Sequence, residues 1–276
     1  MSDKQATVIP LDVYELIIDS LAEDDKELTT MRACSLVSRA FLPLSRKHIF
    51  ASIKISSLLR RTSPSIDKFV HLIERNPEIS EYVRKFNYYI TTRDHIPHTL
   101  RELTKLKSLT LWYSSENKPV WRTNWPMRSA LLHLMQLPTL SHLKLCWITN
   151  FPVSDLIYSS SLKHLKIDHT NFAAEDVVPP STTPLPRKSV CLCKYSAGLR
   201  SASATKKLVE AKRPDGLPIV DFTELTKVTA NFDYQEDINV IQPIFIQAKQ
   251  LEEIDLTSKL PLFRRRRTSL TNHAQF

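Results

Sequence analysis

The sequence predicts a mixed α+β or α/β protein in which a three-helix module precedes an irregular solenoid of short strands and helices. Residues 8–50 hold 22 apolar residues in 43, against 42% over the whole chain, which favours packed helices. From residue 79 onward the pattern apolar-x-x-apolar-x-apolar recurs, and a recurring short pattern is typical of stacked repeats. The 276 residues are enough for one large domain or for a small module and a larger one.

Composition shifts divide the chain into five expected segments. The body is interrupted by a Pro/Ser/Thr-rich stretch, which is typical of a loop because it has little capacity to pack. The segments are a tail (1–7), a helical module (8–50), a helical linker (51–78), a repeat domain (79–261, with a loop near 178–186) and a basic tail (262–276).

The rare residue types exclude several kinds of chemistry. The two glycines, Gly198 and Gly216, cannot form a dinucleotide-binding fingerprint, a phosphate-binding loop or a nucleophile elbow. The four cysteines (Cys34, Cys146, Cys191 and Cys193) lack zinc-ligand spacing. No spacing singles out a nucleophile with its base. We therefore expect no catalytic residues, no cofactor and no metal, so the protein is not expected to be an enzyme.

Cysteine usage and hydropathy also bear on location. Unpaired thiols are typical of a reducing compartment. No secretory signal is seen at the N-terminus, and no apolar run reaches about 18 residues, the length that spans a bilayer. We expect a cytoplasmic or nuclear protein, or one found in both, without membrane contact.

The N-terminal module is expected to contain helices near 11–21, 27–34 and 36–48. In the first helix, Asp12, Glu15 and Asp19 form one acidic stripe, and nearly all the other residues are apolar. So wide an apolar arc indicates burial on more than one side. Because three short helices bury little surface alone, the arc is expected to pack on the chain's own body, on a partner, or on both.

Two strings in this module resemble an F-box. Residues 9–21 read Ile-Pro-Leu-Asp-Val-Tyr-Glu-Leu-Ile-Ile-Asp-Ser-Leu, similar to the opening Leu-Pro and first helix of that motif. Residues 34–46 read Cys-Ser-Leu-Val-Ser-Arg-Ala-Phe-Leu-Pro-Leu-Ser-Arg, similar to its second half. Ile9 stands in place of the usual Leu, Phe41 stands in place of the usual Trp, and the acidic link between the first two helices, at residues 23–25, is longer than usual.

The resemblance implies an adaptor function. F-boxes bind a Skp-family adaptor, which in turn binds a cullin that carries a ubiquitin-ligase core. An amphipathic helical face that enters a partner's apolar groove fits this role physically. By position in the motif, the adaptor-binding residues would be Pro10, Leu16, Ile17, Leu21, Val37, Ser38 and Leu44.

The apolar triplets predict short strands in the body. Four of the six gaps between their central residues are 22 to 26 residues, and the two longer gaps contain expected helices at 128–137 and 202–213. This resembles the degenerate leucine-rich repeats that follow F-boxes in many fungal proteins. The triplets are Val83/Phe86/Tyr88, Leu106/Leu109/Leu111, Leu140/Leu143/Leu145, Leu162/Leu165/Ile167, Leu225/Val228/Ala230 and Leu251/Ile254/Leu256, with a weaker copy at Val190/Leu192.

Residues between and just after the triplet positions are expected on the opposite, open face of the strands, since side chains alternate. These are Asn87, Tyr89, Thr110, Trp112, Lys144, Lys166, Asp168, Thr229 and Asp255. Aromatic and cationic residues are frequent in recognition surfaces. Tyr89, Trp112, Lys144 and Lys166 are therefore the candidate substrate-binding residues, and the hypothesis is that this face recognises an acidic or phosphorylated degron.

The leading functional expectation is a non-catalytic, substrate-recruiting adaptor of a Skp–cullin–F-box ubiquitin ligase, with an unknown protein substrate. A repeat scaffold without a ligase role stays open. A nucleic-acid-binding protein is a further alternative, because the net charge is +9 and residues 264–267 are all Arg; no zinc-finger, helix-turn-helix or RNA-binding signature supports it. Residues 60–63 and 266–269 both read Arg-Arg-Thr-Ser, a pattern typical of a basophilic kinase site.

Overall fold

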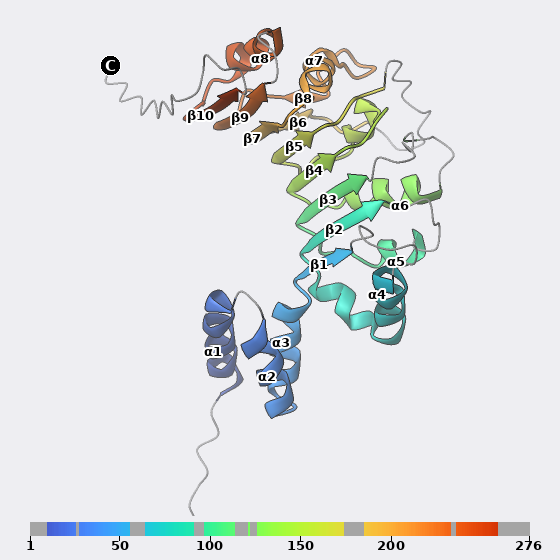
Figure 1. Ribbon diagram of the computed structural model, residues 1–276, viewed down its shortest axis with the longest axis vertical. Helices are drawn as coiled ribbons and strands as arrows, with labels where there is room; N and C mark the ends of the chain where they lie inside the picture. The colour runs from blue at the N-terminus through green and yellow to red at the C-terminus, as the bar shows by residue number, and fades with distance from the viewer. Residues whose placement is uncertain are drawn as a thin grey trace, which may run out of the picture.

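A computed structural model describes residues 10–25, 28–55, 64–90, 97–113, 121, 126–173, 185–232 and 236–258. Figure 1 shows three N-terminal helices at one end and, after them, a long curved sheet with its helices along one side. The two expected tails, most of the loop near 178–186 and both Arg-Arg-Thr-Ser sites lie outside the described residues.

The three N-terminal helices are α1 (Leu11–Asp24), α2 (Thr29–Val37) and α3 (Phe41–Ile49). Pro10 precedes α1, where the missing N–H costs little. The side chain of Asp25 caps the first turn of α2. Its carboxylate accepts hydrogen bonds from the backbone N–H groups of Thr29 (3.0 Å) and Met31 (2.9 Å). The expected acidic link is therefore partly the end of α1 and partly the cap of α2.

Eight strands form one sheet in which every neighbouring pair is parallel, in the order β1-β2-β3-β4-β5-β7-β9-β10. A separate pair, β6 (Val190–Cys191) and β8 (Val220–Asp221), is also parallel. The strands of the main sheet are β1 (Ser52–Ile55), β2 (Lys85–Ile90), β3 (Ser108–Tyr113), β4 (His142–Cys146), β5 (His164–Asp168), β7 (Lys194–Ala197), β9 (Lys227–Phe232) and β10 (Glu253–Ser258).

The strand register aligns the apolar residues of successive strands. Phe86 pairs with Leu109, Leu109 with Leu143, and Leu143 with Leu165. The second apolar residue of each strand is aligned in the same way. These residues are buried against the helices that cover one face (Figure 1), while the intervening residues face away from that core.

The covering elements fill the connections between strands. They are α4 (Pro64–Arg75), η1 (Pro77–Tyr82), α5 (Pro97–Arg101), α6 (Pro126–Met135), η3 (Val153–Leu156), α7 (Ala202–Glu210) and α8 (Glu236–Gln247). Each connection runs from the end of one parallel strand back to the start of the next, as parallel pairing requires. The expected helices at 128–137 and 202–213 correspond to α6 and α7.

The fold class expected from the sequence is wrong. The structure is an α/β fold built on a single eight-stranded parallel sheet, and its N-terminal helices are not a clear F-box ahead of a solenoid. The three helices bury only Ile18, Met31 and Ser45 among them, so they lack a closed core of their own. The triplet pattern is local, whereas the pairing of strands into one sheet is a long-range property that no single triplet carries.

Two strands of the sheet were absent from the sequence prediction. β1 lies inside the segment expected as a helical linker, and its Ile55 belongs to the main core. The second is β7. Val190 of the weaker triplet belongs to β6, outside the main sheet, because the strand that pairs with β5 there is β7. The residues that align with Leu165 and Ile167 are Tyr195 and Ala197, so the true triplet is Leu192/Tyr195/Ala197, all buried.

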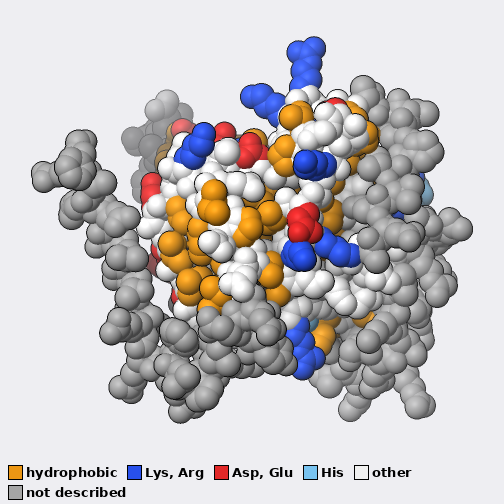
Figure 2. Space-filling model, turned by 90° about the horizontal axis from the view of Figure 1, so that it is seen from above, with side chains coloured by type: hydrophobic (Ala, Val, Ile, Leu, Met, Phe, Trp, Pro, Cys, Tyr) orange, Lys and Arg blue, Asp and Glu red, His pale blue; other side chains and the backbone are white. Residues whose placement is uncertain are grey.

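The sheet ends at β10, which has no strand on its outer side among the described residues. Ile254 and Leu256 of β10 occupy positions that are buried in the other strands, but they are 38% and 41% exposed. Figure 2 looks down on this end of the molecule, where hydrophobic side chains gather at the surface. The apolar side chains of β10 are thus left partly uncovered by the other described residues.

A buried ion pair connects two of the covering elements in the middle of the chain. Asp155 of η3 accepts hydrogen bonds from Arg128 of α6 (Nη2–Oδ1 2.5 Å, Nε–Oδ2 3.1 Å) and from the indole N–H of Trp121 (2.7 Å). All three residues are buried. These hydrogen bonds connect η3 to α6 and to Trp121, the one described residue between β3 and α6.

We expect Asp155→Ala to lower the free energy of unfolding by about 3–5 kcal/mol, because it leaves the Arg128 guanidinium buried without its carboxylate. Urea titration followed by circular dichroism measures the loss. Asp255→Ala, which removes an exposed carboxylate from β10, is the matched control and should change the free energy by less than about 0.5 kcal/mol. Equal effects of the two substitutions would contradict the structural role of Asp155.

Candidate functional site

The outer surface of α1 and α2 is unusually apolar. Seven of the twelve exposed large hydrophobic residues in the described chain lie on these two short helices. The most exposed are Leu36 (87%), Leu16 (69%) and Val37 (69%). We call these seven residues the helical apolar surface: Leu11, Val13, Leu16, Ile17, Leu21, Leu36 and Val37.

The charged stripe of α1 faces inward instead. Lys47 of α3 donates to Glu15 (2.9 Å) and to Asp19 (3.4 Å), and His48 Nε2 lies 2.6 Å from Asp19 Oδ1. Tyr14 meets Phe41 edge to face, with ring centroids 5.2 Å apart. These contacts turn the acidic side of α1 toward α3 and leave the apolar side of α1 pointing outward.

The inward contacts also affect ionisation. Partial burial favours the neutral form of Asp19, but the hydrogen bond to His48 and the charge of Lys47 outweigh it and lower the Asp19 pKa. The hydrogen bond to Glu15 raises the pKa of Lys47. These charged groups line the edge of the α1–α3 contact, where Glu15, Asp19 and Lys47 stay 43–49% exposed, and they lie beside the buried Ile18.

The structure places most of the expected adaptor-binding residues on this outer surface. Leu16, Ile17 and Leu21 of α1 and Val37 of α2 are among the exposed residues, and Pro10 and Ser38 are exposed next to them. Leu44 differs, because it lies half-buried on α3. Sequence reasoning omitted Leu11, Val13 and Leu36, which share the surface.

The four expected substrate-binding residues lie on neighbouring strands of the open sheet face. Tyr89 of β2 and Trp112 of β3 are paired in register, and their rings stack with centroids 6.1 Å apart. Lys144 of β4 lies on the other side of Trp112, with Nζ 4.5 Å from the ring centroid, a cation–π contact. Lys166 of β5 is the register partner of Lys144.

Two histidines beside these lysines were missed by the sequence analysis. His142 pairs with His164, and their rings meet edge to face with centroids 3.9 Å apart. Burial lowers the pKa of His164 from 6.5 to about 4, and His142 and Lys194 act in the same direction. The signal was present in the sequence, because β4 begins His-Leu-Lys-Leu and β5 begins His-Leu-Lys-Ile.

A second aromatic pair follows β4 and β5. Trp147 and His169 stack with centroids 3.8 Å apart and nearly parallel planes. Both residues have positive φ angles (61° and 47°), a conformation that costs energy for residues other than glycine. The indole is 40% exposed, so this pair forms an aromatic rim where the two strands end.

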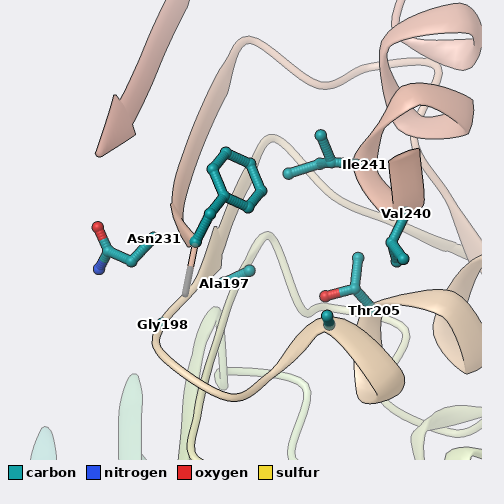
Figure 3. Close-up of a pocket in the computed structure, with 8 residues that line it drawn as sticks. Ala197, Gly198, Thr205, Asn231, Val240 and Ile241 are labelled. Carbon is teal, nitrogen blue, oxygen red and sulfur yellow. The ribbon is translucent and has the colours of Figure 1, made fainter. Parts of the chain in front are cut away.

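A small pocket lies near the C-terminal end of the sheet. Figure 3 shows it between β7, β9, α7 and α8, lined mainly by apolar side chains such as Ala197, Val240 and Ile241. Its Thr205 hydroxyl is already engaged with Tyr195 and with the Ser201 carbonyl oxygen. In the described ranges, no group of three or more His, Cys, Asp or Glu residues is arranged to hold a metal ion.

No helix in the described part of the chain combines the length and the apolar character needed to cross a bilayer.

Comparison with known proteins adds no family assignment: no protein-family model matches the chain, and no curated protein matches its sequence.

We expect His164 to make the fold less stable as the pH falls. Its pKa is about 4 in the folded chain and about 6.5 when unfolded, so the unfolded state binds more protons between these values. Stability that is present above about pH 6.5 is therefore lost progressively toward pH 4. Urea midpoints at about pH 7 and pH 5 should differ less in His164→Asn than in the wild-type chain. An NMR titration of His164 with a midpoint near 6.5 would contradict this.

Proposed function

We propose that the chain is a non-catalytic, substrate-recruiting adaptor of a cullin-type ubiquitin ligase. In this proposal, the helical apolar surface binds a Skp-family adaptor and the open sheet face binds a protein substrate. The protein acts in the cytoplasm, the nucleus or both. Its contribution is to hold substrate near the transferring enzyme, which raises the effective concentration of the two reactants.

The observation that carries the proposal is the number of large apolar side chains exposed on α1 and α2. Glu15 and Asp19 pair with Lys47 and His48 at the edge of the α1–α3 contact, while large apolar side chains point outward. Exposing these side chains has no benefit to the isolated chain, since burying each would stabilise it by about 1.5–3 kcal/mol. Exposed large apolar residues gathered on two neighbouring helices are typical of a docking site.

The occupant we favour is a helical groove-forming partner. The apolar residues of α1 recur at Val13, Leu16, Ile17 and Leu21, a spacing that presents one helical face to a groove. The resemblance of residues 9–21 and 34–46 to an F-box favours a Skp-family adaptor among such partners. The helices that carry this surface lie at the β1 end of the sheet (Figure 1).

We expect Leu16→Glu combined with Val37→Glu to abolish co-purification with a co-expressed Skp-family adaptor. Each substitution places a charge in an interface that must exclude water, and together they should weaken binding at least about 100-fold. Because both side chains are exposed in the free chain, its fold should be unaffected by circular dichroism.

The matched control is Ile246→Glu on α8, which adds the same charge at a residue 76% exposed. It should leave the complex intact. If the wild-type chain forms no complex, or if the double variant binds as well as wild type, the ligase-adaptor proposal fails and a scaffold without a ligase role is favoured.

A further inference from the structure

The open sheet face contains a square of four basic side chains that the register brings together. His142 and Lys144 belong to β4, His164 and Lys166 to β5, and each residue pairs with its like across the two strands. Neighbouring strands are about 4.8 Å apart, and alternate residues of a strand about 6.6 Å. We call these four residues the His–Lys square.

Basic side chains prevail in this square, and Asp168 of β5, two residues after Lys166 on the same face, is an acidic neighbour. Directly opposed like-charged residues on neighbouring strands destabilise a sheet, yet Lys144 faces Lys166. Neither lysine makes an ion pair with a described residue. The charged side chains that act on the histidine pair from other strands are Lys85 of β2 and Lys194 of β7, which are also basic. An anion bound over the square would relieve this repulsion.

The spacing favours an extended acidic peptide as that anion. Alternate side chains of an extended segment are also about 6.6–7 Å apart. A Glu-x-Glu segment lying along β4 and β5 can therefore place one carboxylate near the two histidines and the next near the two lysines. Charge complementarity of this kind is a common basis of specific recognition.

The neighbouring aromatic pair makes Trp112 a poor stacking site for single-stranded nucleic acid, which binds by stacking bases on exposed aromatic faces. Tyr89 of β2 stacks on the Trp112 ring, and Lys144 of β4 has its Nζ 4.5 Å from the ring centroid. Trp147, after β4, is 40% exposed, so binding of an oligonucleotide is kept as an outcome of the test.

We propose that the His–Lys square binds an acidic Glu-x-Glu peptide segment and that binding takes up protons at His142 and His164. In the free chain the two imidazoles are neutral at neutral pH, surrounded by Lys85, Lys194 and each other. A carboxylate placed over them favours the imidazolium form. By linkage, a ligand that raises the pKa of a group binds more tightly as the pH falls through that range. The identification of the bound peptide segment as part of a substrate rests on the proposed function.

The test uses the purified full-length chain and a fluorescent peptide with three Glu-Ala repeats, measured by fluorescence anisotropy at low ionic strength. We expect the dissociation constant to be about tenfold lower at about pH 5.5 than at pH 7.5. Peptide carboxylates stay largely ionised in this range. A phosphorylated serine peptide is the comparison, because its phosphate loses part of its charge near pH 6 and should show a weaker pH effect.

Variants separate the two halves of the square. His142→Asn with His164→Asn should remove the pH dependence and leave affinity at about pH 7.5 within about twofold of wild type. Lys144→Gln with Lys166→Gln should weaken binding at both pH values about tenfold or more. The control is Lys68→Gln with Lys206→Gln, two exposed lysines on α4 and α7 in the helical layer, which should bind like wild type.

Three results would overturn the proposal. They are equal binding of a peptide with Gln in place of Glu, a pH dependence that survives the double histidine variant, and tighter binding of a single-stranded oligonucleotide than of the acidic peptide. No Skp-family adaptor is present in this assay, so its outcome is independent of whether the helical apolar surface binds one.

Discussion

The whole sheet depends on one packing constraint: each strand must place two apolar side chains at the same height as those of its neighbours. Phe86, Leu109, Leu143 and Leu165 form one such row, and the next row runs parallel to it. Because side chains alternate along a strand, fixing the buried rows also fixes the open rows. The stacked rings of Tyr89 and Trp112 and the opposed pairs of histidines and lysines are therefore consequences of hydrophobic register, and they need no separate positioning device.

The two candidate surfaces use opposite chemistry. In α1, Glu15 and Asp19 pair with Lys47 and His48 of α3, while the leucines of the helical apolar surface and Ile17 are exposed to solvent. The sheet face is basic and aromatic, with its apolar residues buried below. The surfaces belong to separate parts of the chain, which are connected where Ala51 accepts backbone hydrogen bonds from Arg84 and Lys85. One molecule can thus present an apolar contact and a polar contact to two different partners.

Much of the local structure could be predicted from the sequence, and the global arrangement could not. In each complete triplet the second and third residues lie in a strand and the first residue lies just before it, and the open-face residues follow from alternation. Tyr195 was missed because the apolar pair at Val190 and Leu192 competes with it in the sequence, and only pairing with Leu165 decides between them. The expected F-box ahead of a solenoid was wrong: the structure is an α/β fold with an eight-stranded parallel sheet, and the triplets do not show that β6 and β8 leave this sheet to form a separate pair. The contact of Asp19 with His48 joins residues far apart in the chain, and no spacing rule anticipates it.

The connections between strands differ widely in length, yet the strands stay aligned. The chain between β4 and β5 is short and contains only a 3₁₀ turn, whereas the chain between β7 and β9 includes α7 and the extra strand β8. Length differences are therefore absorbed outside the sheet, and the cost of a longer loop grows only slowly with its length. Insertions in these connections can accumulate without moving the open face, while a one-residue shift inside a strand would exchange its lysines for leucines.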